Sequence, residues 1–288
     1  MRGAAVPRAL GPILLALMAL GGLIAASSTW PPVPRNRTAA AAAPVAVSGE
    51  GTIQHPERCG SRIHRGGNYQ EGATRLMGKC ERSVVPPRIR TEPGNRFLEF
   101  RTTGKSARGN DRVELAYGPY LPFARTTYIG FRLRIPTGAP LTNEGFYPLQ
   151  LWQCAPLSPI AGVRVDRGTS HAINFMTRHQ NRDTAVAARF RLKPGQWHAF
   201  VIAARPDPEG AGQFDVWADG RRIARWRGAF GSDETAACKG VPGTPPQHYR
   251  LKFGLYKGNE PKRFVTHFDD LRIGESMVEV NPLAWTGR

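Results

Sequence analysis

The stretch Tyr249-Arg250-Leu251-Lys252-Phe253-Gly254-Leu255-Tyr256 alternates between apolar and polar residues. Successive side chains of a β-strand point to opposite faces of a sheet, so the alternation predicts a strand that buries its three apolar side chains. The other face then presents two cations and a phenol, those of Arg250, Lys252 and Tyr256. Such a face is either a solvated outer surface or part of a binding surface.

Similar alternating runs recur along the chain, among them residues 111–116, 128–135, 146–153 and 171–178. The 25 Pro and 32 Gly residues indicate many turns and few long helices. We count roughly ten to twelve short strands, which predicts an all-β antiparallel sandwich, a jelly roll of two stacked sheets in one domain. Residues 155–169 are interpreted as a Pro/Gly-rich loop and residues 76–82 as a short helical turn.

The N-terminus resembles a targeting segment. Arg2 and Arg8 precede an apolar run that ends in small residues, which is typical of a secretory signal peptide. The run is short for a membrane-spanning helix, which needs about 20 residues, and an uncleaved anchor is the alternative. We therefore expect a signal segment at 1–29, a disordered Pro/Ala-rich linker at 30–47 and a folded domain at 48–288. The protein is then secreted, with no stable membrane insertion after cleavage.

Four cysteines remain in the folded part: Cys59, Cys80, Cys154 and Cys238. An even count in an exported protein favours disulfides. Three pairings can be drawn, and we prefer Cys59–Cys80 with Cys154–Cys238 because the first two cysteines are close in sequence. No Cys-x-x-Cys motif is present, and the spacings do not suggest a zinc site.

The formal net charge is +18, and removing the four arginines of residues 1–47, which contain no acid, leaves +14 for the folded part. An exported protein this basic favours polyanions such as acidic polysaccharide, anionic cell wall, nucleic acid or a membrane surface. A high arginine content can equally reflect genome composition and solubility. The stacked-aromatic pattern of RNA-binding domains is absent, so we expect no nucleic-acid partner.

Several strands present polar side chains of a matching kind on the face that alternation turns away from the core. These candidates are Arg112 and Glu114, Gln150 and Trp152, Asn174 and Arg178, and Arg250, Lys252 and Tyr256. These residues come from runs far apart in sequence. A polar face shared by several such runs is stronger evidence for a binding surface than any one run.

The order of short motifs carries a resemblance. The motifs are Arg-x-Glu-Leu (112–115), Gln150, Gly-x-Trp-His (195–198), Val-Trp-x-Asp-Gly (216–220), Lys-Phe-Gly-x-Tyr (252–256) and Phe-Asp-Asp-Leu-Arg-Ile-Gly (268–274). Over about residues 85–275 this order resembles secreted polysaccharide lyases with a concanavalin A-like jelly roll, in particular the heparin lyase I-like and glucuronan/alginate lyase groups. The Lys-x-Gly-x-Tyr strand followed by Asp-Asp-x-x-Ile-Gly is the most specific part.

The resemblance implies a groove for an acidic glycan on the concave face of one sheet. It implies that Arg112 and Gln150 neutralise a uronate carboxylate, that Tyr256 transfers protons and that Lys252 supports Tyr256 and holds substrate. The other residues of the polar face are then substrate-binding: Trp152, Asn174, Arg178, Arg250 and Glu114. A monomer that needs no cofactor is expected. Asp269-Asp270 could bind calcium, although carboxylates at a strand end are more often turn or capping groups.

The chemistry explains these residue types. β-Elimination removes the weakly acidic C5 proton of a uronate and expels the O4 leaving group, which requires the carboxylate charge to be neutralised. Arginine offers a planar pair of donors that fits a carboxylate, and glutamine adds neutral hydrogen bonds. A tyrosine phenolate beside cations can take the C5 proton and return it to O4.

The chain departs from the lyase pattern at Trp152, where a Gln-x-His motif would place histidine. Tryptophan cannot accept a proton, although it can stack on a sugar ring. Three interpretations remain: Tyr256 acts as both base and acid, another histidine takes part, with His171 best placed, or the site only binds. A lyase is thus our first hypothesis and a lectin-like module for acidic glycans the second. A structural cell-wall protein that relies on charge alone is the third.

Overall fold

The alternating stretch forms most of β16 (His248–Lys257), an interior strand of an antiparallel sheet. Leu251, Phe253 and Leu255 are completely buried, as the alternation predicted. The structure is a computed structural model that describes residues 52–54, 67–71, 74–78, 87–104, 111–117, 120–154, 157–233, 247–257 and 262–284.

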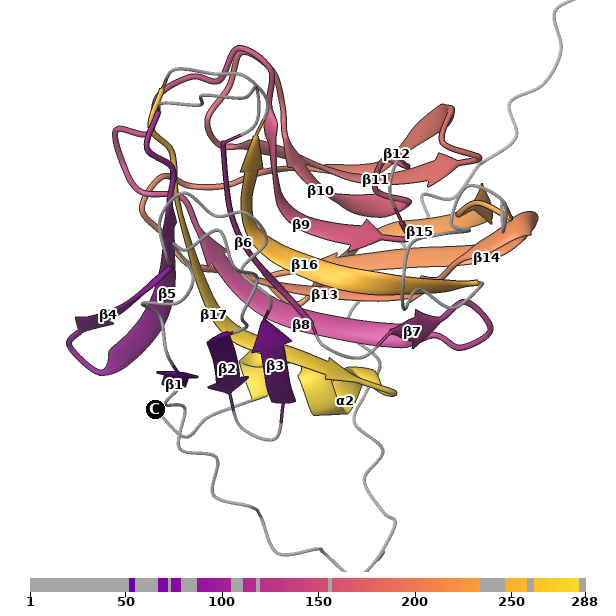
Figure 1. The fold of residues 1–288 in the computed structure, drawn as a ribbon, viewed down its shortest axis with the longest axis horizontal. Helices are drawn as coiled ribbons and strands as arrows, with labels where there is room; N and C mark the ends of the chain where they lie inside the picture. Colours follow the sequence, from indigo (N-terminus) through magenta and orange to yellow (C-terminus); the bar gives the residue numbers. More distant parts are fainter. Residues whose placement is uncertain are drawn as a thin grey trace, which may run out of the picture.

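Two antiparallel sheets are stacked face to face (Figure 1). The first sheet has the order β12 (Asp183–Arg191), β11 (Ala172–His179), β10 (Ala161–Val165), β9 (Phe146–Trp152), β16 and β6 (Asp111–Ala116), and β7 (Leu121–Pro122) also pairs with β16. The second sheet has the order β15 (Arg221–Phe230), β14 (Asp207–Ala218), β13 (His198–Arg205), β8 (Thr127–Arg134), β17 (Val265–Gly274), β5 (Asn95–Arg101) and β4 (Arg88–Glu92).

Smaller elements complete the described part. A three-stranded sheet joins β1 (Thr52–Gln54), β2 (Gly67–Glu71) and β3 (Thr74–Gly78). The short helix α2 (Met277–Val280) packs on the outer face of the second sheet and is followed by the 3-10 turn η2 (Pro282–Ala284). Within the described residues, no helix is long and apolar enough to cross a membrane.

The core between the sheets is built from inward-facing side chains of both. Phe253 of β16 meets Phe100 of β5 and Phe268 of β17, with ring centroids 5.7 Å from each. The ring centroids of Phe100 and Phe268 are themselves 5.8 Å apart, so three mutually packed aromatic rings connect the first sheet to the second. Fully burying one such ring stabilises the fold by about 1.5–3 kcal/mol. The predicted all-β antiparallel sandwich is confirmed.

Two local predictions were wrong. The supposed loop at 155–169 contains β10, whose Val163 and Val165 are completely buried between β9 and β11. The strand was missed because Gly162 interrupts its apolar pattern, yet a side chain there would meet the carbonyl oxygen of Leu149 at 2.5 Å. The supposed helical turn at 76–82 begins inside β3, which pairs with β2.

An irregularity in β9 decides which of its side chains face outward. Phe146 and Leu149 both lie in the core although three positions separate them, and the pairing register shifts between these two residues. Pro148, which cannot donate a backbone hydrogen bond, lies in the shifted segment. As a result Tyr147, which simple alternation would place with Leu149 in the core, lies on the outer face.

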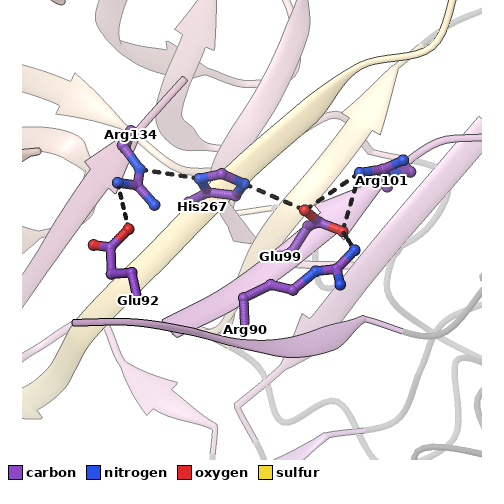
Figure 2. A network of polar contacts seen from close by, with 6 residues as sticks. All are labelled: Arg90, Glu92, Glu99, Arg101, Arg134 and His267. Atoms are coloured by element: carbon purple, nitrogen blue, oxygen red, sulfur yellow. Dashed lines mark hydrogen bonds and ion pairs between the residues drawn. The ribbon is translucent and has the colours of Figure 1, made fainter. Parts of the chain in front are cut away.

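A network of six polar side chains covers part of the outer face of the second sheet (Figure 2). Its centre is His267 of β17, whose Nδ1 accepts a hydrogen bond from Nε of Arg134 at 3.0 Å. The other ring nitrogen, Nε2, therefore carries the proton and lies 3.5 Å from a carboxylate oxygen of Glu99. The remaining members are Arg90, Arg101 and Glu92, which pair with Glu99 and Arg134.

The disulfide prediction lies mostly outside the described residues. Cys154 follows β9, is completely buried and is not a free thiol. Cys59, Cys80 and Cys238 belong to segments that the structure does not describe, so the pairing of the four cysteines stays a prediction.

The backbone of Gly254 gives the first testable prediction. Its φ is 132°, and an added Cβ would lie 2.4 Å from the carbonyl oxygen of Val113 and 2.7 Å from the ring of Phe100. We expect Gly254→Ala to lower the free energy of unfolding by about 2–4 kcal/mol, measured by urea denaturation. Gly210→Ala is the matched control, since Gly210 has a φ of 120° but open space around it. Equal losses for the two variants would contradict the steric argument.

The His267 network gives the second prediction. Burial, together with the nearby Arg134 guanidinium, lowers the pKa of His267 from 6.5 to about 4. Between pH 6.5 and 4 the imidazole of His267 is protonated in the unfolded chain but not in the folded chain. The free energy of unfolding therefore falls as the pH drops through this range. His267→Asn keeps an acceptor for Arg134 and does not titrate. We expect the wild type to lose about 1–2 kcal/mol more than this variant between pH 7 and pH 5 in urea denaturation. Parallel stability curves would contradict this role of His267.

Candidate active site

A buried polar contact joins β6 to β9 across β16. Nε2 of Gln150 donates a hydrogen bond to Oε1 of Glu114 at 2.5 Å, and the two residues are only 3% and 1% exposed. Gly254 lies opposite Glu114 in the register, and Lys252 lies opposite Gln150. Strands two apart are separated by roughly 10 Å, so the two side chains must reach toward each other over β16. Gly254, between them on β16, has no side chain.

A row of rings and guanidinium groups crosses four neighbouring strands beside this contact. The guanidinium carbon of Arg112 (β6) lies 4.5 Å from the ring centroid of Tyr256 (β16). The Tyr256 ring stacks on that of Tyr147 (β9) with centroids 6.4 Å apart and planes at 30°. The guanidinium carbon of Arg164 (β10) lies 5.7 Å from the Tyr147 ring. Two phenols are thus flanked by two cations, at typical cation–π distances.

Neither phenol of this row is engaged elsewhere. Among the described residues, no hydrogen bond is made by the hydroxyl of Tyr147 or of Tyr256. The amide of Gln150 has two N–H donors, of which Glu114 takes one. The two hydroxyls and the second N–H of Gln150 thus have no hydrogen-bond partner within the described ranges.

Two cations of β16 are held by aromatic side chains. Nζ of Lys252 lies 3.7 Å from the ring centroid of Trp152, and Lys252 is 4% exposed. Arg250 donates a hydrogen bond to the hydroxyl of Tyr120 at 2.6 Å and lies over the same ring. One face of the Trp152 indole is therefore occupied by a cation and is not free to stack on a sugar ring.

The charge on this face is strongly positive. The side chains that meet here include the cations of Arg112, Arg164, Arg250 and Lys252, and the carboxylate of Glu114 lies 3.8 Å from Arg112. Such an excess of cations concentrates anionic ligands at the surface. Glu114, predicted to bind substrate, is buried and contacts both Gln150 and Arg112.

Two other predicted residues lie farther along the same sheet. Asn174 of β11 is paired in the register with Arg164, and its amide donates a hydrogen bond to Asp166. Its carbonyl oxygen, like Nε of Arg178, is buried and has no hydrogen-bond partner among the described residues. We call Arg112, Glu114, Tyr147, Gln150 and Tyr256 the central cluster. Asn174 and Arg178 lie beyond it, on the strand next to β10.

The structure does not bring His171 into the cluster. Its ring nitrogens lie 2.6 Å from the hydroxyl of Ser170 and 3.3 Å from the carbonyl oxygen of Pro136. Both nitrogens are thus engaged at the edge of the sandwich.

Sequence reasoning missed Tyr147, Arg164 and Tyr120. Arg164 was assigned to a loop, and Tyr147 has the wrong parity for the outer face until the bulge in β9 is taken into account. Pro148 inside an otherwise regular strand was the available signal, since proline in a sheet interior marks a bulge or an edge.

The suggested calcium ligands are engaged in other contacts. Asp270 has a φ of 52° and an ion pair with Arg132 at 3.0 Å, and its backbone N–H donates to the side chain of Asp269. Within the part of the chain that the structure describes, no three His, Cys, Asp or Glu side chains gather as a metal site would require.

The chain is similar to known proteins of one family. The model of a family described as "Polysaccharide lyase" matches residues 72–272. The fold is similar to an endo-β-1,4-glucuronan lyase from the fungus Trichoderma reesei, at 14% identity and a TM-score of 0.51, with 68% of this chain and 90% of that chain covered. It is also similar to an alginate lyase of polysaccharide lyase family 7, at 12% identity and a TM-score of 0.45, covering 65% and 82%.

At such identities the similarity to solved structures shows the fold alone. No curated protein matches the sequence. The family model, however, spans well over half of the chain, including every residue of the central cluster. The chain therefore belongs to the polysaccharide lyase family.

Proposed function

We propose that this protein is a secreted lyase that cleaves a uronate-containing acidic polysaccharide by β-elimination. The observation that carries the proposal is the meeting of Arg112, Gln150 and Tyr256 around the buried Glu114 carboxylate on one cationic face. A guanidinium and an amide donor there suit a carboxylate, and a phenol beside them suits proton transfer.

The first step of the reaction is neutralisation of the uronate carboxylate. Arg112 and the second N–H of Gln150 bind its oxygens, so that the negative charge that develops when the C5 proton leaves is delocalised into a stabilised carboxylate. Glu114 orients both donors and does not touch substrate. Binding energy is thereby directed at the transition state, where the charge is greatest.

Tyr256 then takes the C5 proton as a phenolate. The electron pair of the C5–H bond forms the C4=C5 double bond, and the C4–O4 bond breaks. The guanidinium of Arg112 over the ring stabilises the phenolate electrostatically. Lys252 and Arg250 add positive charge that holds the polyanion, with Trp152 providing apolar contact to sugar.

Asn174 and Arg178 extend this surface along the sheet, where the next residues of a bound chain would lie. Export follows from the N-terminal segment, which has the pattern of a signal peptide. A polysaccharide too large to enter a cell requires an enzyme outside it.

The test is the ultraviolet absorbance of the unsaturated uronate product, using the residue 1–288 chain after export and a panel of heparin, heparan sulfate, glucuronan, alginate and hyaluronan. We expect one class of substrate to give a rise. Tyr256→Phe should lower kcat by about 10²–10⁴-fold with little change in KM, because it removes the proton-transfer group and keeps the ring.

A flat trace across the panel with selective glycan binding still present would favour the lectin-like alternative, for which the tryptophan at position 152 is the argument. Binding abolished by moderate salt, without selectivity among glycans of equal charge, would favour the third hypothesis, attraction by charge alone.

Glu114 gives a separate prediction. Glu114→Ala leaves Gln150 without its acceptor and Arg112 without its neighbouring carboxylate, so both donors lose their orientation. We expect kcat/KM to fall by roughly 10²-fold, chiefly through kcat. Glu114→Gln keeps an acceptor for Gln150 and should retain more activity. If the two variants were equally active, the hydrogen bond to Gln150 would not be what positions the site.

A further inference from the structure

The stacked pair Tyr147–Tyr256 presents two free phenols where a single proton-transfer group would suffice. Their rings are 6.4 Å apart, they come from adjacent strands, and each has its own arginine, Arg164 for Tyr147 and Arg112 for Tyr256. Both side chains are partly exposed, whereas the apolar side chains of the same strands are buried. A purely structural role would not require either hydroxyl to remain without a partner.

In the lyase pattern a histidine stands where this chain has Trp152, and tryptophan cannot transfer protons. Trp152 has no basic nitrogen, and one face of its ring is covered by Nζ of Lys252 at 3.7 Å. His171 is held by Ser170 and Pro136. Neither Trp152 nor His171 is therefore placed to transfer a proton to or from Tyr256, whereas the hydroxyl of Tyr147 lies on the ring stacked against Tyr256.

We propose that Tyr147 is a second catalytic residue, the general acid that protonates the leaving O4 oxygen while Tyr256 removes the C5 proton. This inference rests on the proposed function. As the C4–O4 bond breaks, its electron pair goes to O4, which takes the proton of the Tyr147 hydroxyl. Tyr147 leaves the step as a phenolate and Tyr256 as a phenol, and one proton passed from Tyr256 to Tyr147 restores the starting state. No oxidant or further reactant is needed.

The flanking arginines make this division of roles electrostatically reasonable. Each phenolate forms beside a guanidinium, Arg112 before the elimination and Arg164 after it. A cation facing an aromatic ring favours a negative charge on that ring's oxygen. Arg112 thus stabilises the phenolate of Tyr256 before the C5 proton is removed, and Arg164 stabilises the phenolate of Tyr147 after O4 is protonated.

The experiment compares Tyr147→Phe with Tyr256→Phe on the polysaccharide that the wild type cleaves. Both variants keep the ring and its stacking. Tyr128→Phe is the matched control, since Tyr128 packs near α2 on the outer face of the second sheet. We expect Tyr147→Phe to lower kcat by about 10²-fold or more with KM nearly unchanged, and Tyr128→Phe to behave as the wild type.

A second readout separates acid from base. In D2O, an enzyme that can remove the C5 proton but cannot expel O4 exchanges that proton for deuterium in recovered substrate, which mass spectrometry detects. We expect exchange with Tyr147→Phe and none with Tyr256→Phe. A Tyr147→Phe variant with full activity, or one that loses activity without exchange, would overturn the assignment of Tyr147 and leave the lyase proposal intact. A wild type without lyase activity would instead overturn the proposed function.

Discussion

The hydrogen bond between Glu114 and Gln150 is the constraint on which the site depends. A buried carboxylate is costly unless it is paired, and Glu114 meets this requirement with Gln150 on one side and Arg112 on the other. The bond crosses β16, so β6, β16 and β9 must share one register. A slip of one residue would turn the polar side chains of a strand into the core. Gly254, opposite Glu114 on β16, cannot be replaced without moving Val113 or Phe100.

The bulge in β9 is the second structural requirement. It turns Tyr147 outward and keeps Phe146 in the core, although the two are consecutive and Leu149 also points inward. With regular alternation, the next outward side chain after Gln150 would be that of Pro148, and Tyr147 would point into the core. The two stacked phenols thus exist because the strand departs from regular pairing, and bulges often serve to re-aim a side chain next to a functional site.

The sequence predicted the architecture well because burial follows alternation wherever strands are regular. Leu251, Phe253 and Leu255 are buried for this reason, and Arg112, Gln150 and Tyr256 fell on the correct face. Alternation failed where one strand departs from its neighbours' register, since the partner strand and not the local sequence decides the parity. It also could not show that the carboxylate of Glu114 points at Gln150 instead of at solvent, because that contact joins strands which are not adjacent.

The replacement of histidine by tryptophan at position 152 then has a consistent physical explanation. A histidine at this place would lie against the ammonium of Lys252, which disfavours the protonated form that a general acid needs. An indole instead attracts the ammonium, here at 3.7 Å, and leaves Lys252 oriented while it is nearly buried. The other outward residue of the same strand, Tyr147, lies against Tyr256 and is the group that we propose for the second proton transfer. One bulged strand thereby carries Gln150, the ring that holds Lys252 and the phenol stacked on Tyr256.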